Sequence, residues 1–334
     1  MISMIETHAP EIFARVAKDG SRFRCSESFV RSYLRGHHWS VRRSTRAAQK
    51  VPADAEKQCE QSFMRQAKAI RDDGIPAALR VNSDQTNVQA VPGANETWNE
   101  AGQKQITVNG KDDKRAFTVM NGISASGIVL PMQAIYAGKT AAVLPKRTLE
   151  NAQAWDEIEK TGTVHFNWSG NDSYWSTMHT MKIYVNDILV PYFTATKEEL
   201  RLPKNQLCIW QIDCWSVHRS EEFRAWMSTR HPDIQLEYVP GGCTGIWQAC
   251  DVGIQRVFKH AIRRAARADM IAEALSELRK DVNEDAGAIH LSKSLPVIRN
   301  RSVGWLYKAY KAVDDPAFVK KVCTFLLRLV LITN

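Results

Sequence analysis

The sequence lacks the cysteine patterns of disulfide-rich and zinc-binding domains. Its seven cysteines are odd in number and include no CxxC pair, which argues against a disulfide framework or a zinc knuckle. Cys243, Cys250 and His218 do not fit a common zinc spacing either, since six residues separate the two cysteines. We therefore expect a reducing compartment.

Long apolar runs are also missing. The N-terminal segment has no basic flank followed by an apolar stretch, so it does not look like a secretory signal. The apolar segment 322–332 spans eleven residues and contains Arg328, whereas a membrane-spanning helix needs about 20. We expect a terminal core helix there and no membrane partner.

Compositional bias is absent, but charge is unevenly distributed. An apolar share of 44% and a charged share of 24% are ordinary for a globular protein. Residues 1–50 hold ten Lys or Arg against four acids, and residues 255–334 hold fifteen against eight, so the centre is mildly acidic. This distribution suits a protein that binds a polyanion at its basic ends and cations in its acidic centre. A solvated basic surface is the plainer explanation.

The N-terminal region predicts short helices. Residues 10–18 suggest one helix, and Ser26 begins a second whose apolar positions share one face. The basic residues on and after that second helix are Arg31, Arg35, His38, Arg42 and Arg43. They fit the end of a helix-turn-helix DNA-binding unit, but any helical hairpin with a basic face would look the same.

The middle of the chain predicts an α/β domain. A helix is expected over 54–73, followed by three adjacent β-rich runs that form an antiparallel meander. The apolar run QLCIWQID predicts a buried strand, followed by a helix over 220–230, a strand at IQLEYVP and a long helix from Trp247 to Leu278.

Three aspartates stand at ends of these elements. Asp84 is expected to end the first strand, Asp213 to end the apolar strand, and Asp251 to open the long helix. Carboxylates are the ligands that Mg²⁺ prefers, and a pair of such ions can promote phosphodiester cleavage. Because Asp is also a common turn and N-cap residue, position alone leaves a metal site and exposed turn acids about equally favoured.

The phrases around these aspartates resemble the DDE superfamily of mariner and pogo-like transposases, to which centromere protein B is related. NSDQTNVQAVPG resembles the first-aspartate segment, QIDCWSVHRS the second, and VPGGCTGIWQACDVGIQRVFKHAIR the third. KRAFTVMNGISASGIVLPMQAIYAGKT resembles the second and third strands, and SESFVRSYLRGHHWSVRRSTRAAQK the end of a helix-turn-helix.

The resemblance implies an α/β fold with a ribonuclease H-like mixed sheet flanked by helices, in which the first and fourth strands are neighbours. It implies Asp84, Asp213 and Asp251 as catalytic residues and as ligands of Mg²⁺ or Mn²⁺, with two ions. Double-stranded DNA is the implied partner, with a homodimer as an option and the nucleus as the location. The expected domains are a partial helix-turn-helix segment (1–50), a linker and connecting helix (51–77), the catalytic domain (78–280) and a C-terminal helical extension (281–334).

Two departures from the family pattern stand out. Trp247-Gln248-Ala249-Cys250-Asp251 lacks the proline that commonly precedes the third acid. A full family member begins with two helix-turn-helix units, and this chain retains at most part of the second, so we expect a truncated or decayed element or an incomplete gene prediction.

Further residues have weaker signals. His218 occupies the place of a histidine that often follows the second aspartate, and it either orients water or phosphate or simply caps the next helix. Lys259, Arg263 and Arg264 belong to a basic stripe on the long helix, where Val257, Ile262 and Ile271 are expected to face inward. Such a stripe can follow a phosphate backbone.

Three functions are consistent with the sequence. The first is a metal-dependent transposase that cleaves transposon ends and transfers the freed strand to target DNA. The second is a catalytically silent, sequence-specific DNA-binding protein of the centromere protein B type. The third, less favoured, is a nuclease acting on RNA–DNA hybrids, which does not account for the helix-turn-helix remnant.

Overall fold

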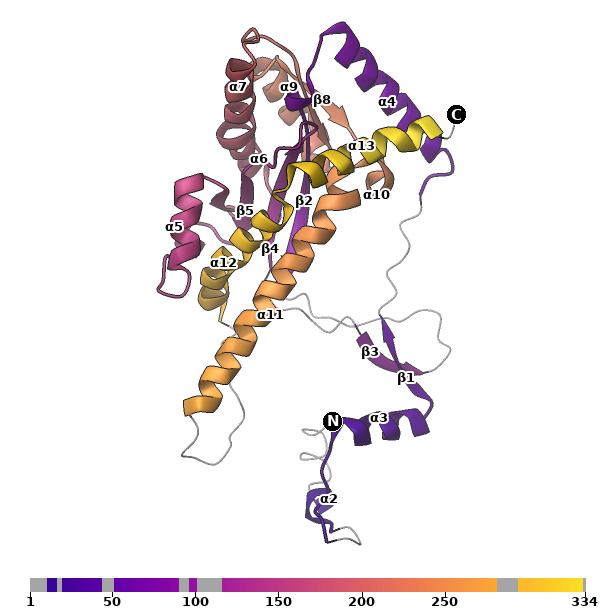
Figure 1. Cartoon of the computed structure of the whole chain (residues 1–334), viewed down its shortest axis with the longest axis vertical. Coiled ribbons are helices and arrows are strands. Elements are labelled where there is room, and N and C mark those ends of the chain that lie inside the picture. Colours follow the sequence, from indigo (N-terminus) through magenta and orange to yellow (C-terminus); the bar gives the residue numbers. More distant parts are fainter. Residues whose placement is uncertain are drawn as a thin grey trace. The chain divides into compact units, whose positions relative to one another are not determined.

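The computed structural model describes residues 11–16, 20–43, 51–89, 96–100, 116–280 and 294–332. Its chain divides into two compact units, one formed by residues 1–48 and 93–112 and the other by residues 49–92 and 113–334. Figure 1 shows the elements of each unit.

In its described residues, the N-terminal unit contains two helices and a two-stranded sheet. Its elements are α2 (Glu11–Ala14), α3 (Glu27–Gly36), β1 (Trp39–Arg43) and β3 (Glu96–Glu100). The Ser26 hydroxyl accepts a hydrogen bond from the Phe29 amide at 3.1 Å, an N-cap that fixes where α3 begins. β1 and β3 pair antiparallel, so a segment within the range predicted for the catalytic domain belongs to this unit.

The helix predicted over 10–18 is wrong in extent. Helical backbone ends at Ala14, and Val16 instead forms an isolated antiparallel bridge with Arg22. A residue in a β-bridge has extended backbone, so the helix ends before Val16.

The larger unit is built on a six-stranded mixed sheet with the order β6-β5-β4-β2-β7-β8. The strands are β2 (Arg80–Gln89), β4 (Ala116–Ser124), β5 (Met132–Tyr136), β6 (Val164–Trp168), β7 (Cys208–Ile212) and β8 (Ile234–Tyr238). β2, β4 and β5 form the predicted antiparallel meander. β7 lies parallel to β2, as expected for the two strands of a ribonuclease H-like sheet that precede or carry the first two aspartates, although β6 makes it the fifth strand of this sheet in chain order and not the fourth.

Helices cover both faces of this sheet. They are α4 (Ala55–Asp72), α5 (Ala152–Thr161), α6 (Met178–Tyr184), α7 (Val190–Glu199), α8 (Ser216–Arg219), α9 (Glu221–Arg230), α10 (Thr244–Trp247), α11 (Gln255–Lys280), α12 (Leu295–Val313) and α13 (Pro316–Ile332). Residues from α6, α7 and α9 form one buried apolar cluster, and residues from α4 and α10 to α13 form the other. β4 is buried along its whole length because apolar clusters lie on both of its faces.

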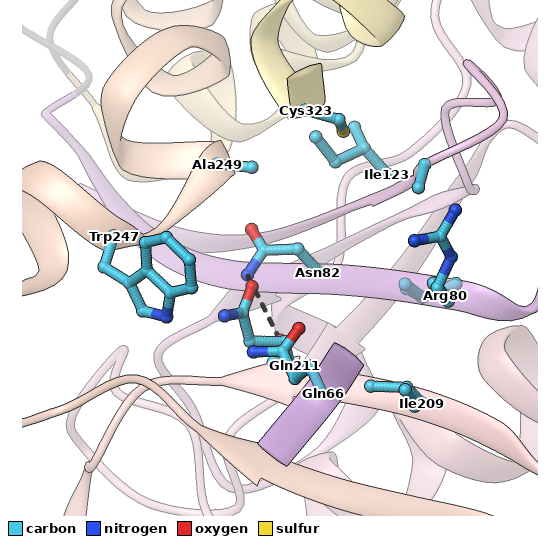
Figure 2. A pocket seen from close by; sticks show the side chains of 11 residues that line it. Gln66, Arg80, Asn82, Ile123, Ile209, Gln211, Trp247, Ala249 and Cys323 are labelled. Atoms are coloured by element: carbon cyan, nitrogen blue, oxygen red, sulfur yellow. Dashed lines mark hydrogen bonds between the residues drawn. The ribbon is translucent and has the colours of Figure 1, made fainter. Parts of the chain in front are cut away.

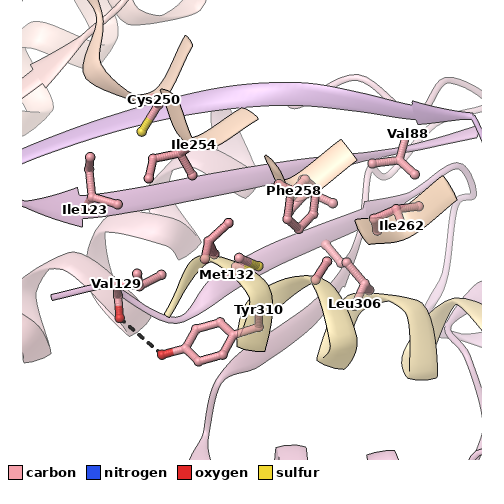
Figure 3. Close-up of a cluster of buried hydrophobic side chains, with 14 of the residues drawn as sticks. Val88, Ile123, Val129, Met132, Cys250, Ile254, Phe258, Ile262, Leu306 and Tyr310 are labelled. Atoms are coloured by element: carbon pink, nitrogen blue, oxygen red, sulfur yellow. Dashed lines mark hydrogen bonds between the residues drawn. The ribbon is translucent and has the colours of Figure 1, made fainter. Parts of the chain in front are cut away.

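The apolar cluster formed by residues from α4 and α10 to α13 holds α11 and α12 against the sheet. Figure 3 shows Ile254, Phe258 and Ile262, one helical turn apart, packed over the sheet beside α12. Tyr310 of α12 donates a hydrogen bond from its hydroxyl to the Val129 carbonyl at 3.2 Å. The i, i+4, i+8 spacing therefore places one face of α11 on the sheet.

Several sequence-based boundaries need correction. Asp84 does not end its strand, because β4 pairs with β2 as far as Gln89. The long helix does not run unbroken from Trp247: backbone is extended at Gln248, whose side chain donates to the Ser83 carbonyl at 3.3 Å. Ile271 does not face inward but is 54% exposed.

The strand β6 and the helix α5 were missed in a stretch that the sequence left mixed. β6 pairs parallel to β5 at the sheet edge, and only its first residue, Val164, is buried, so its sequence lacks the alternation that indicates a strand. Of the described helices, none combines the length and the apolar character needed to cross a bilayer.

Candidate active site

Asp84 lies in the middle of the central strand β2 and is only 8% exposed. Gln255 Nε2 donates to Asp84 Oδ2 at 2.9 Å. Asn121, directly opposite Asp84 on β4, donates from Nδ2 to Gln255 Oε1 at 3.1 Å. Two buried amides thus fix the orientation of the Asp84 carboxyl.

The carboxyls of Asp84 and Asp251 are within hydrogen-bonding reach of each other. Burial first, and then the charge of Asp251, raise the pKa of Asp84 well above its usual value. Burial also raises the pKa of Asp251, while its contact with Asp84 and the nearby Lys259 ammonium oppose that rise. Two carboxyls in contact with raised pKa values form a site that a cation would stabilise.

Asp251 reaches Asp84 because the chain before it is anchored to the sheet. The Cys250 amide donates to Asn82 Oδ1 at 2.9 Å, and Asn82 lies two residues before Asp84 on the same face of β2. Asp251 sits in a wide π-helical turn, Cys250–Ile254, which leads directly into α11. A Cβ atom at Gly253 would lie 2.5 Å from a methyl of Val322, so glycine is needed there for α13 to pack against the turn.

Asp213 follows the last residue of β7 and is directed toward His218. His218 Nδ1 lies 2.8 Å from Asp213 Oδ1 and 3.3 Å from the Asp213 carbonyl. The imidazole side chain is 2% exposed, and the rings of Trp210, Trp215 and Phe223 surround it. Its buried Nε2 has no hydrogen-bond partner among the described residues. His218 therefore fits a residue that orients Asp213 better than one that contacts a substrate.

The three aspartates are brought to one region but are not equally close. Asp213 acts on both other acids by its charge, whereas Asp84 and Asp251 are in direct contact. Within the described residues, no three His, Cys, Asp or Glu side chains are arranged closely enough to hold a metal ion. The donor chemistry nevertheless suits a hard divalent cation, because carboxylate oxygens are the ligands that Mg²⁺ and Mn²⁺ prefer.

The amides around Asp84 were missed from the sequence, although one of them had a detectable signal. Gln255 stands four residues after Asp251 and therefore shares its helix face. Asn121 could be found only from the strand register, which depends on the fold.

The basic residues predicted on α11 are at its surface. Arg263 and Arg264 are exposed, and Lys259 is half-buried near Asp251. A groove of about 490 Å³ between α11 and α12 adds His260, Lys308 and Lys311 to this basic surface. The two lysines of α12 were missed because the predicted stripe followed a single helix.

In the N-terminal unit, Arg31, Arg35 and His38 are exposed. Arg31 forms an ion pair with Glu27 one turn away on the same helix. Arg42 and Arg43 lie in β1, and their side chains lie outside the described part of the structure. A DNA-binding role for these residues stays a prediction.

The family of the chain follows from a match over residues 114–318 to the model of the family described as DDE superfamily endonuclease. The match covers more than half of the sequence, and the chain belongs to this family. Asp213 and Asp251 lie within the matched residues, whereas Asp84 precedes them. Comparison with curated protein sequences gives no match.

Solved structures with partial similarity are complexes and domains of the Mos1 transposase. The Mos1 strand transfer complex is 10% identical, with 98% of this chain and 74% of that chain covered and a TM-score of 0.39. The catalytic domain of Mos1 mariner transposase is 10% identical, with 79% of this chain and 94% of that chain covered and a TM-score of 0.34. A Mos1 paired-end complex with Mn is 11% identical, with 86% and 70% covered and a TM-score of 0.37.

Proposed function

We propose that the chain is the catalytic part of a cut-and-paste DNA transposase that hydrolyses phosphodiester bonds at transposon ends and transfers the freed strand. The observation that carries this proposal is the convergence of Asp84 and Asp251, with Asp213 nearby, in a member of the DDE superfamily endonuclease family. Membership of the family supports nuclease activity, and we assign these three aspartates as its active site.

In this proposal, Asp84, Asp213 and Asp251 hold divalent metal, Mg²⁺ or Mn²⁺, as two ions. The bound metal would activate water and stabilise the departing oxygen of the cleaved bond. Gln255 and Asn121 keep Asp84 oriented, and His218 keeps Asp213 oriented. Because each acid is held by a separate element, substrate and metal meet carboxylates whose positions are already fixed.

DNA is the proposed substrate, bound as a duplex along the basic surface of α11 and α12. Lys259, Arg263 and Arg264 are placed on the helix that follows Asp251, so a phosphate backbone along them leads toward the acids. We also propose a homodimer and a nuclear location. Light scattering of the purified chain with and without DNA tests the first, and microscopy of a tagged chain tests the second.

The decisive experiment compares the full chain with its Asp213→Asn variant in cleavage of DNA carrying the terminal inverted repeats of the element. Both are assayed with Mg²⁺ and with Mn²⁺, and Asp72→Asn on the exposed side of α4 is the matched control. We expect cleavage by the parent chain and by the control, and a loss of about 10³-fold or more in Asp213→Asn.

Equal cleavage by the parent chain and Asp213→Asn would overturn the assignment. Sequence-specific DNA binding without cleavage would favour a silent DNA-binding protein instead. Cleavage confined to RNA–DNA hybrids would favour the third function.

A further inference from the structure

A pocket with a mostly apolar lining and a few polar side chains lies at the beginning of β2, away from the acids. It has a volume of about 90 Å³ and is formed by residues from α4, β2, β4, β7, α10 and α13 and from the segments beside them. A single water needs roughly 10–15 Å³, so the pocket has room for a small ion with several oxygens. None of the described residues that line it is Asp or Glu.

The pocket contains a cation without a counter-charge. Arg80 Nε is buried and has no hydrogen-bond partner among the described residues, and the ion pairs of the described chain do not include Arg80. Burial lowers the pKa of the guanidinium, as expected for a desolvated cation, yet arginine stays charged in proteins. Arg80 as a whole is only partly buried, but its buried Nε donor is unpaired, which is costly, so an anion that accepts from Nε would stabilise the fold.

Two amides that line the pocket together with Arg80 can also donate to an anion in it. Figure 2 shows Gln66 and Gln211 beside Asn82, with Arg80 at another side of the same pocket. Gln211 Oε1 accepts from Asn82 Nδ2 at 3.1 Å, which leaves the Gln211 Nε2 hydrogens for another acceptor. Gln66 Nε2 makes only a long hydrogen bond of 3.4 Å, to Ser62 Oγ. Guanidinium and amide donors together match the oxygens of a phosphate group.

The pocket is distinct from the acidic site although both lie along one strand. Arg80, Asn82 and Asp84 share a face of β2, and four residues place Arg80 roughly 13 Å from Asp84. Cys250 is anchored to Asn82 between them, and Trp247 and Ala249 of the same segment line the pocket. A ligand in the pocket therefore lies against the segment that carries Asp251.

We propose that this pocket binds a phosphate group, as a free ion, as a phosphomonoester or as part of a DNA backbone, with Arg80 as its charged anchor and Gln66 and Gln211 as further donors. The site goes beyond the cleavage reaction, and phosphate binding to it does not require the acids to be active. Occupancy fills the space beneath the Trp247 to Cys250 segment and so supports the position of Asp251.

The first test measures the Tm of the full chain, without divalent metal, in sodium phosphate and in sodium chloride of equal ionic strength. We expect a saturable rise of about 3 °C when phosphate is about ten times its dissociation constant. Arg80→Met should lose the rise, Arg80→Lys should keep part of it, and Arg71→Met on the exposed side of α4 should behave like the parent chain.

A second variant, at the rim of the pocket, keeps the proposal testable if Arg80→Met does not fold. Gln66→Met removes one donor from a partly exposed position and should weaken phosphate binding about tenfold. The proposal is overturned if phosphate gives no rise beyond that of chloride, if Arg80→Met responds like the parent chain, or if Gln66→Met binds phosphate with unchanged affinity.

The second test identifies the source of the phosphate. Duplex DNA binding is measured as a function of salt concentration for the parent chain, Arg80→Met and Arg71→Met. If a backbone phosphate occupies the pocket, Arg80→Met lowers the salt slope by about 0.9 relative to Arg71→Met and inorganic phosphate competes with DNA. If the ligand is a free phosphate, the slopes agree while the Tm response persists. A chain that fails to cleave DNA but keeps the Arg80-dependent Tm response retains the phosphate site and loses only the proposed transposase function.

Discussion

The two halves of β2 offer a comparison within one strand. Around Asp84, carboxyls crowd together: burial raises the pKa values of Asp84 and Asp251, and the charge of Asp251 raises that of Asp84 further. Around Arg80, a partly buried guanidinium has a buried Nε without a hydrogen-bond partner among the described residues, and no acid among them lines its pocket. The same strand face thus carries a negative cluster and a lone positive charge, separated by the Asn82 contact with Cys250.

This difference shows how ligand sites of opposite sign can be placed on one rigid element. A buried charge without a counter-charge lowers stability, and a ligand of opposite charge restores it. Asp84 and Asp251 therefore favour a cation, whereas Arg80 favours an anion. The amide contacts of Asn82 and Gln255 hold the two regions in place without neutralising either of them.

The largest effect is expected from removing charge in the acidic half. Asp84→Asn and Asp251→Asn should each reduce metal-dependent DNA cleavage by about 10³-fold or more, because each variant loses a carboxylate from the metal site. Cleavage of end-labelled repeat DNA measures this. Asp72→Asn should cleave like the parent chain. If Asp84→Asn or Asp251→Asn retains full activity, the substituted carboxylate is not required for the reaction.

A smaller loss is expected from Gln255→Met. This variant keeps the size of the side chain but removes the donor to Asp84, so cleavage should fall about 10–100-fold and the Mg²⁺ concentration for half-maximal rate should rise. Titration of cleavage with Mg²⁺ separates this role from a loss of folding. Gln61→Met on the surface of α4 is the control, and an unchanged Mg²⁺ titration would argue against positioning by Gln255.

Ligand-induced stabilisation should respond to the two halves in opposite ways. Mg²⁺ should raise the Tm of the parent chain and of Arg80→Met, but not that of Asp84→Asn. Phosphate should raise the Tm of the parent chain and of Asp84→Asn, but not that of Arg80→Met. Shifts of about 3 °C are expected at ligand concentrations about ten times the dissociation constants. A variant that loses both responses would show that the two regions do not act separately.

The pH dependence of stability should distinguish Asp84 from an ordinary surface acid. Its pKa is raised in the folded protein, so the native state binds more protons than the unfolded state between the two pKa values. The free energy of unfolding of the metal-free chain must then fall as pH rises through that window. Asp84→Asn removes this fall and should be more stable at pH 8 by about 1–2 kcal/mol.

Urea unfolding at pH 5 and pH 8 checks this sign. The stability advantage of Asp84→Asn over the parent chain should shrink toward pH 5. It should vanish below about pH 4, where the Asp84 carboxyl is protonated in both the folded and the unfolded parent chain. An advantage that grows with acidity would contradict burial of the Asp84 carboxyl as the cause.

The smallest effect is expected on the basic surface of α11. Arg263→Gln and Arg264→Gln should each lower the slope of duplex DNA affinity against salt by about 0.9, with little change in sequence preference. Arg147→Gln, whose guanidinium is paired with Asp156, should leave the slope unchanged. Equal slopes in all three variants would place the DNA elsewhere on the molecule.

Local patterns predicted the elements whose character depends on neighbouring residues in the chain. The apolar run of β7, the meander of β2, β4 and β5, and the Ser220 start of α9 follow from the alternation and capping of their own residues. β6, β1 and β3 were missed because a strand at an edge or in a two-stranded sheet gains its stability from its partner. The break at Gln248 was missed because a distant carbonyl, that of Ser83, accepts its side-chain hydrogen bond.

The sequence by itself determined the family and named Asp84, Asp213 and Asp251, because their flanking phrases are continuous stretches of chain. Only the tertiary structure decided which acids are in contact, that Asp213 faces His218, and that Gln255 and Asn121 hold Asp84. It also revealed that Arg80, a partly buried cation, has a buried Nε without a hydrogen-bond partner among the described residues. Burial and the lack of a counter-charge are properties of surrounding residues that come from distant parts of the chain, so no local pattern contains them.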